Sequence, residues 1–218
     1  MMTMTDEIFD FENEFERQKK ILIENGYHIL ANLTEEQFSK QINVLKSRLK
    51  SVPKGKPDIE NGYIPFVIVL SSALVPLITQ MELIKRETKQ GIEKLFPHKI
   101  EDFQPIEELK IPQTFAYLLI CIERGKEYLN VTPNEAILSI TAKKRTPLTI
   151  AEGIALLTYY PEFLLKNNCF SLLGSRIANN KRVPAIWLNA KKHPNLGWCW
   201  AGNPHTWLGS ASALSRDT

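Results

Sequence analysis

The stretch RVPAIWLNAKKHPNLGWCWAGNPHTWLGSASA (residues 182–213) decides the fold class. Its apolar and aromatic residues come in short runs separated by Asn, Gly, Pro and Lys, and this pattern begins at Cys169. Short apolar runs bounded by such residues are typical of strands joined by turns. The last quarter of the chain is therefore predicted to form a small antiparallel sheet.

Upstream of this sheet, the sequence predicts helices. Capping boxes, in which a Thr is followed three residues later by Glu or Gln, start at Thr34, Thr132 and Thr149. The last two head the similar segments TPNEAILSIT and TIAEGIALLT, which we interpret as two similar helix starts. Further helices are predicted before Gly26, with Ile8 on the apolar face, and over residues 77–93.

Two apolar segments, residues 66–70 and 115–122, predict buried strands between the helices. The fold class is therefore α+β, with N-terminal helices, a mixed middle region and a small antiparallel sheet at the C-terminus. We expect one α+β domain over residues 1–218. It comprises a helical part (1–50), the Pro- and Gly-rich linker SVPKGKPDIENG (51–62) and the main body (63–218).

Composition and cysteine content predict a soluble, cytoplasmic protein. The three cysteines, Cys121, Cys169 and Cys199, are too few for a disulfide framework. The N-terminal residues carry acids where a secretory signal needs positive charge. Residues 61–81 lack charge, but their prolines interrupt a spanning helix, so we expect them to be buried and expect no membrane partner. The oligomeric state stays open.

Positive charge is concentrated at the C-terminal end. Residues 163–218 hold seven basic side chains and one acidic side chain, Asp217, whereas residues 1–162 hold 20 basic and 23 acidic ones. All four tryptophans lie in the same last quarter. Guanidinium and ammonium groups bind phosphates, and indole faces stack on bases.

This charge block makes non-enzymatic binding of an anionic partner, a nucleic acid or a phosphorylated small molecule, the leading hypothesis. The same tryptophans could equally form the core of the sheet, with lysines at its rim. The candidate ligand-binding residues are Ser175, Arg176, Arg182, Trp187, Trp198, Trp200, Asn203, His205 and Trp207.

Two alternative functions stay open, so the sequence leaves it uncertain whether the chain is an enzyme. One is an enzyme that uses Cys199 with His193 or His205, with or without a metal. Cys169, His193, Cys199 and His205 are zinc-ligand types, but no pair has the short spacing of structural zinc sites, so we expect no metal and no cofactor. The other alternative is a protein-interaction module.

Five segments resemble a family of uncharacterised bacterial proteins, a domain of unknown function, over about residues 26–216. They are YIPFVIVL, LNVTPNEA, RTPLTIAEGIALLT, LGSRIANNKRVPAIWL and GWCWAGNPHTWLGSAS. The resemblance implies a bacterial, soluble, single-domain protein and supplies no reaction, cofactor or catalytic residue. Two positions depart from the family pattern: Asn179-Asn180-Lys181 replaces a Gly-Asp-Arg type sequence, and Ala213 stands where a cysteine often follows.

Overall fold

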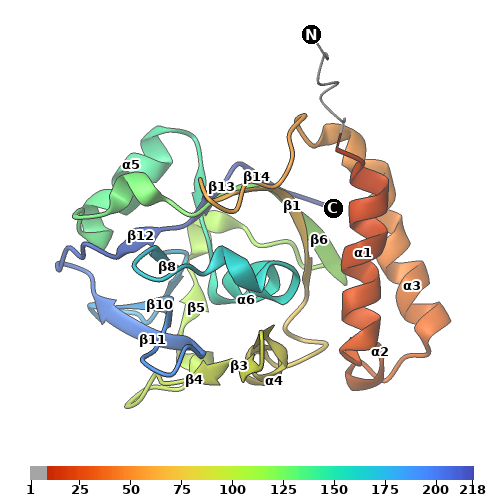
Figure 1. Ribbon diagram of the computed structural model, residues 1–218, viewed down its shortest axis with the longest axis horizontal. Helices are drawn as coiled ribbons and strands as arrows, with labels where there is room; N and C mark the ends of the chain where they lie inside the picture. Colours follow the sequence, from red (N-terminus) through yellow and green to blue (C-terminus); the bar gives the residue numbers. More distant parts are fainter. Residues whose placement is uncertain (1–8) are drawn as a thin grey trace, which may run out of the picture.

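Helix α6 (Ile150–Tyr159) is apolar on nearly every side, and this determines its place in the fold. Ile150, Ile154, Leu156 and Leu157 are all buried, and only two residues of the helix are partly exposed. A helix that is apolar all round has to lie inside the protein. In the computed structural model, which describes residues 9–218, α6 accordingly occupies the centre of the molecule, between the two main sheets (Figure 1).

The first sheet is built on an antiparallel pair, β1 (Tyr63–Leu70) and β6 (Ala116–Glu123). Both strands are buried along most of their length, which confirms the two predicted strands. The end of the chain returns to this sheet, because β13 (Ser212–Ala213) and β14 (Ser215–Asp217) both pair with β6. β7 (Thr146–Pro147) pairs with β13 and completes the sheet.

The N-terminal helices cover the β1 side of this sheet (Figure 1). They are α1 (Phe11–Glu24), α2 (Tyr27–Leu30), α3 (Glu35–Asn43) and the 3₁₀ helix η1 (Val44–Ser51). The buried Gln18 of α1 joins the edge of β1, because its amide accepts from the Ile68 N–H and donates to the Phe66 carbonyl. A side chain thus satisfies the backbone groups that an edge strand leaves unpaired. Ile8 lies outside the described residues.

The second sheet has the strand order β12-β8-β10-β11-β4. Its strands are β8 (Cys169–Ser171), β10 (Arg182–Leu188), β11 (Pro194–Trp200), β12 (Leu208–Ser210) and β4 (Ile92–Glu93). The centre of the sheet is antiparallel, and each edge strand, β12 and β4, joins in parallel. With helices first and strands last, the α+β class is confirmed.

The three predicted capping boxes are all formed. They lie at Thr34, at Thr132 before α5 (Pro133–Ala142) and at Thr149 before α6. The remaining elements are short: η2 (Ile100–Asp102), β5 (Gln104–Pro105), η3 (Glu107–Leu109), η4 (Lys126–Tyr128), η5 (Pro161–Phe163) and β9 (Ser175–Arg176).

The prediction of a helix over residues 77–93 is correct for the first turns and wrong beyond them. Helix α4 (Leu77–Leu83) is short, and the chain then forms a tight hairpin from β2 (Lys85–Arg86) and β3 (Lys89–Gln90). Glu87 takes a left-handed conformation at the turn, with φ of 56°. Gly91 then passes so close to α4 that a Cβ there would overlap the Met81 carbonyl oxygen. Arg86 of this hairpin lines the candidate site.

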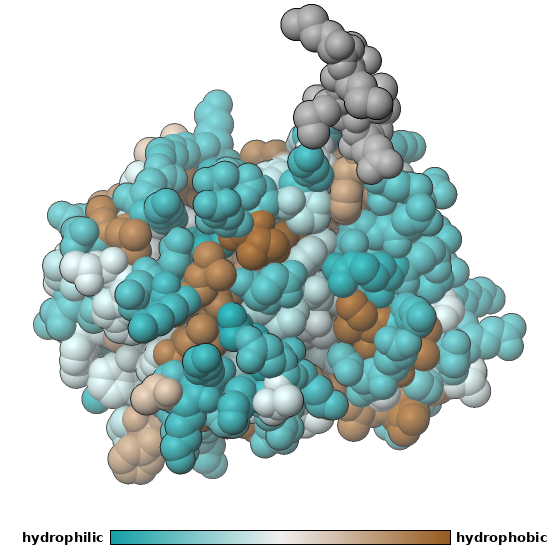
Figure 2. All heavy atoms as spheres, in the orientation of Figure 1, coloured by the Kyte–Doolittle hydropathy of each residue, from teal (hydrophilic) through white to brown (hydrophobic). Residues whose placement is uncertain are grey.

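Most of the face seen in Figure 2 is hydrophilic, with hydrophobic residues exposed in separate patches. Among the helices of residues 9–218, none has the length and apolar character needed to cross a membrane. Within residues 61–81, strand β1 is buried as expected, whereas the turn after it and the first turn of α4 are mostly exposed or half-buried.

Candidate functional site

Three of the four tryptophans divide between the two faces of the β10–β11 hairpin, and Trp207 packs against one of them, Trp187. The antiparallel register pairs Trp187 with Asn195 and Pro184 with Trp198. Because side chains alternate along a strand, Trp187 shares one face with Gly197 and Cys199, whereas Trp198 and Trp200 lie on the other. The tryptophans predicted as one site therefore form two separate pairs, one on each face.

The first pair is stacked with an arginine. The Trp198 and Trp200 rings are 5.2 Å apart, centroid to centroid, and the Arg182 guanidinium lies 4.5 Å and 4.7 Å from their centroids. Trp200 is 41% exposed, and the Trp198 indole N–H donates to the carbonyl of Phe96, which is 86% exposed. This surface is open, and the cation already occupies the indole faces that a ligand would need.

The second pair lines a cavity of about 790 Å³, which we call the indole cavity. The Trp187 and Trp207 rings meet edge to face, with centroids 6.1 Å apart, and the His205 ring lies 5.4 Å from Trp207. Three basic side chains also line the cavity, from segments far apart in the sequence: Arg86, Lys166 and Lys192.

Charge in the indole cavity is mostly positive. Its lining holds three cations and one carboxylate, Glu87, whose oxygen lies 3.2 Å from an Arg86 nitrogen. The Arg86 Nε atom is buried and has no hydrogen-bond partner within residues 9–218. Lys166 and Lys192 are exposed and form no ion pair in that part of the chain. The cavity therefore joins aromatic faces to cations that are free to accept an anion.

The other predicted residues lie elsewhere. Ser175 is buried, and its hydroxyl accepts the Ile150 N–H at 3.0 Å. Arg176 and Arg182 stand on either side of a turn, in which Asn179 has φ of 58°. Burial lowers the pKa of Arg176, which forms no side-chain hydrogen bond within residues 9–218. Asn203 is exposed in the turn after β11.

Cys199 is not arranged as a nucleophile beside a histidine. The thiol is buried, and its one partner in the described part of the chain is the Ser171 hydroxyl, at 3.8 Å. Burial raises the pKa of Cys199, which keeps the thiol protonated. Because side chains alternate along a strand, Cys199 points away from Trp198 and Trp200. No cluster of three His, Cys, Asp or Glu side chains close enough to hold a metal occurs in residues 9–218.

Arg216, part of the basic block, is committed to a structural ion pair. Its Nε and Nη2 atoms bind the two oxygens of Glu152 at 2.6 Å and 2.9 Å, and both side chains are buried. The buried Tyr117 hydroxyl donates to the same carboxylate at 3.0 Å. Burial, followed by the Glu152 charge, raises the pKa of Tyr117, so the phenol stays a donor.

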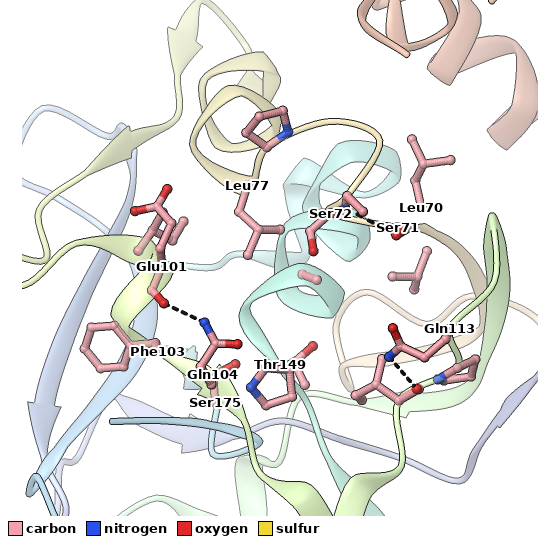
Figure 3. A pocket seen from close by; sticks show the side chains of 18 of the residues that line it. Leu70, Ser71, Ser72, Leu77, Glu101, Phe103, Gln104, Gln113, Thr149 and Ser175 are labelled. Atoms are coloured by element: carbon pink, nitrogen blue, oxygen red, sulfur yellow. Dashed lines mark hydrogen bonds between the residues drawn. The ribbon is translucent and has the colours of Figure 1, made fainter. Parts of the chain in front are cut away.

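Sequence reasoning missed Arg86, because it treated residues 77–93 as one helix. It also missed a second cavity, of about 410 Å³, which Figure 3 shows from close by. That cavity is lined by Ser71, Ser72, Gln104, Gln113 and Thr149 among others, and by Ser175 from the predicted set. These residues come from separate loops and element ends, so no local pattern joins them.

Comparison with known protein families matches residues 21–218 to a family described as a family of unknown function, DUF5701. No curated protein matches the chain, and no solved structure does.

Proposed function

We propose that this chain, which belongs to the family of unknown function DUF5701, binds an anionic ligand with an aromatic ring, such as a nucleotide, in the indole cavity. The observation that carries the proposal is the convergence of two indoles and three basic side chains on one cavity. The binding site expected within the basic, tryptophan-rich quarter is thus proposed to lie on one face of the β10–β11 hairpin.

The chemistry of the lining suits the two parts of such a ligand. A base stacks on the face of one of the two half-buried indoles, and the other indole stands at 72° to the first. Phosphate oxygens accept hydrogen bonds from Lys166 and Lys192, while Arg86 supplies donors from the β2–β3 hairpin. The cavity, at about 790 Å³, is within the size range of pockets for small molecules.

Binding without catalysis fits the side chains at hand. Cys169 lines the cavity and carries a thiol, a group that can act as a nucleophile. It is buried, however, and its thiol donates to the Leu165 carbonyl at 3.3 Å. Burial raises the pKa of Cys169, which disfavours the thiolate that a nucleophile needs. We also propose that the protein is located in the cytoplasm of a bacterium, since its three free cysteines suit a reducing compartment.

Tryptophan fluorescence tests the proposal. The protein is titrated with AMP, ATP and a short oligo(dT) at low and at moderate salt. We expect AMP and ATP to change the emission, with ATP the tighter ligand and with an affinity that falls as salt rises, because salt screens the attraction between the phosphates and the exposed lysines. A strong preference for oligo(dT) over both nucleotides would identify a nucleic-acid site instead.

Matched variants locate the site. Lys192→Ala should weaken ATP binding by about fivefold to tenfold, since a charge-assisted hydrogen bond is lost. Its neighbour Lys191→Ala should leave binding unchanged, because Lys191 does not line the cavity. If Arg182→Ala weakens binding and Lys192→Ala does not, the ligand lies on the opposite face and the proposal is wrong.

A further inference from the structure

The second cavity is assembled from segments far apart in the chain (Figure 3). The turn after β1 supplies Ser71 and Ser72, α4 supplies Leu77, and the start of α6 supplies Thr149. Ser175 of β9 lies close to Thr149 (Figure 3). We call this the central cavity, because Thr149 and Ala151 at the start of the central helix α6 line it. Its volume of about 410 Å³ is that of a small-ligand pocket.

The lining of the central cavity carries almost no charge. No lysine or arginine lines it within the described residues, and Glu101 is its single carboxylate. Leu77, Phe103 and Ile111 are among its apolar residues. Without a cation, and with a carboxylate among the exposed lining residues, the cavity disfavours an anion. It therefore differs in chemistry from the indole cavity.

Two buried hydroxyl groups have protons to donate. The Thr149 oxygen accepts the Glu152 N–H at 3.3 Å, and the Ser175 oxygen accepts the Ile150 N–H at 3.0 Å. Each residue is 2% exposed. A hydroxyl that accepts a hydrogen bond can still donate one, and within residues 9–218 neither proton has an acceptor. A ligand oxygen in the cavity would satisfy both donors.

The exposed side of the cavity offers acceptors instead. The Gln104 amide nitrogen donates to the Glu101 carbonyl at 2.6 Å, and the Gln113 nitrogen donates to the Ile111 carbonyl at 3.1 Å (Figure 3). Both side chains thus direct their nitrogens at the protein and leave their amide oxygens available to accept. Buried donors and exposed acceptors line the same cavity.

We propose that the central cavity binds a small uncharged molecule with a carboxamide group on an apolar ring or chain. The carboxamide oxygen accepts from the Thr149 and Ser175 hydroxyls, and its NH₂ group donates to an amide oxygen of Gln104 or Gln113. The apolar part packs on Leu77 and Phe103. This site is separate from the indole cavity and does not rest on the function proposed there.

Benzamide and benzoate, which share a shape and differ in charge, test the proposal by NMR of the ¹⁵N-labelled chain. Benzamide should shift the backbone signals of Thr149, Ala151 and Ser175, and benzoate should bind at least about tenfold more weakly. Absence of shifts at these residues up to the solubility limit of benzamide would overturn the proposal. Benzoate binding as tightly as benzamide would also overturn it.

Three variants assign the contacts. Ser175→Ala should weaken benzamide binding by about fivefold, through the loss of one donor. Because Ser175 is buried and could affect folding, the exposed Gln104→Leu provides a second measurement and should also weaken binding. Lys192→Ala, in the indole cavity, should have no effect. Unchanged affinity in both Ser175→Ala and Gln104→Leu would contradict the proposed site.

Discussion

Trp187 of β10 lies across Gly197 of β11, in the space that a side chain at residue 197 would occupy. A Cβ on Gly197 would overlap Trp187 Cη2 and would lie 2.9 Å from Cζ3, which is too close for an unstrained contact. The glycine therefore sets the position of the indole that lines the indole cavity.

Gly197→Ala should displace the Trp187 indole. We expect a loss of about 1–3 kcal/mol in the free energy of unfolding, as for other overpacked sites. Ligand binding in the indole cavity should weaken with it. Urea unfolding and the near-ultraviolet circular dichroism of the tryptophans measure the two effects.

The control is Gly202→Ala, in the turn after β11. A Cβ there has no heavy atom within 4 Å, and Gly202 is not among the residues with positive φ. Its stability and spectrum should stay close to those of the parent chain. Equal behaviour of Gly197→Ala and Gly202→Ala would show that the indole moves aside freely.

Features with a local signal could be predicted from the sequence. The three capping boxes and the strands β1 and β6 each follow from consecutive residues. The direction of Cys199, away from Trp198 and Trp200, follows from the alternation of a strand.

Features that depend on pairing could not be predicted. Which face holds Trp187 depends on the register of β10 against β11, which places Trp187 opposite Asn195. Arg86 reaches the indole cavity because Glu87 turns the chain back, against the helical pattern of residues 77–93. The central cavity joins Ser71, Thr149 and Ser175 through tertiary contacts alone.

The two similar capping boxes, at Thr132 and Thr149, should contribute unequally to the free energy of unfolding. Thr132 accepts the Glu135 N–H at 3.2 Å near the surface, whereas the box at Thr149 is buried. Thr132→Ala should cost about 1 kcal/mol of unfolding free energy. Thr149→Ala should cost about 2 kcal/mol or more, because the buried Glu152 N–H loses its acceptor. Urea unfolding of both variants tests this order, and a larger loss for Thr132→Ala would contradict it.

Removal of the Arg216 side-chain charge should be strongly destabilising. Arg216→Met leaves the buried Glu152 carboxylate without its countercharge, which typically costs about 3–5 kcal/mol. The matched control is Lys20→Met, which breaks the exposed Lys20–Glu24 pair of 3.6 Å and should cost less than about 0.5 kcal/mol. Thermal and urea unfolding give both values, and a small loss for Arg216→Met would show that water reaches Glu152.

Stability should fall as the pH rises above about 9. Burial raises the pKa of Cys169 and of Cys199 above the ordinary value of 9.0, and burial raises the pKa of Tyr27 from 10.0 to about 12. All three groups are neutral when protonated, so the folded chain holds its protons to a higher pH than the unfolded chain does. Their contribution is complete below pH 9 and is lost as the unfolded thiols, and then Tyr27, ionise.

Urea unfolding at a series of pH values from 7 to 10 measures this loss, together with alkylation of the native thiols by iodoacetamide. We expect stability to be nearly flat up to about pH 9 and to decline beyond it, while Cys169 and Cys199 stay unmodified in the folded chain. The double variant Cys169→Ala, Cys199→Ala should decline less steeply between pH 9 and 10, because two of the ionising groups are gone. A decline of equal slope in the parent and the double variant would assign the effect to the tyrosines, and rapid alkylation at pH 8 would show that the thiols are not held in the core.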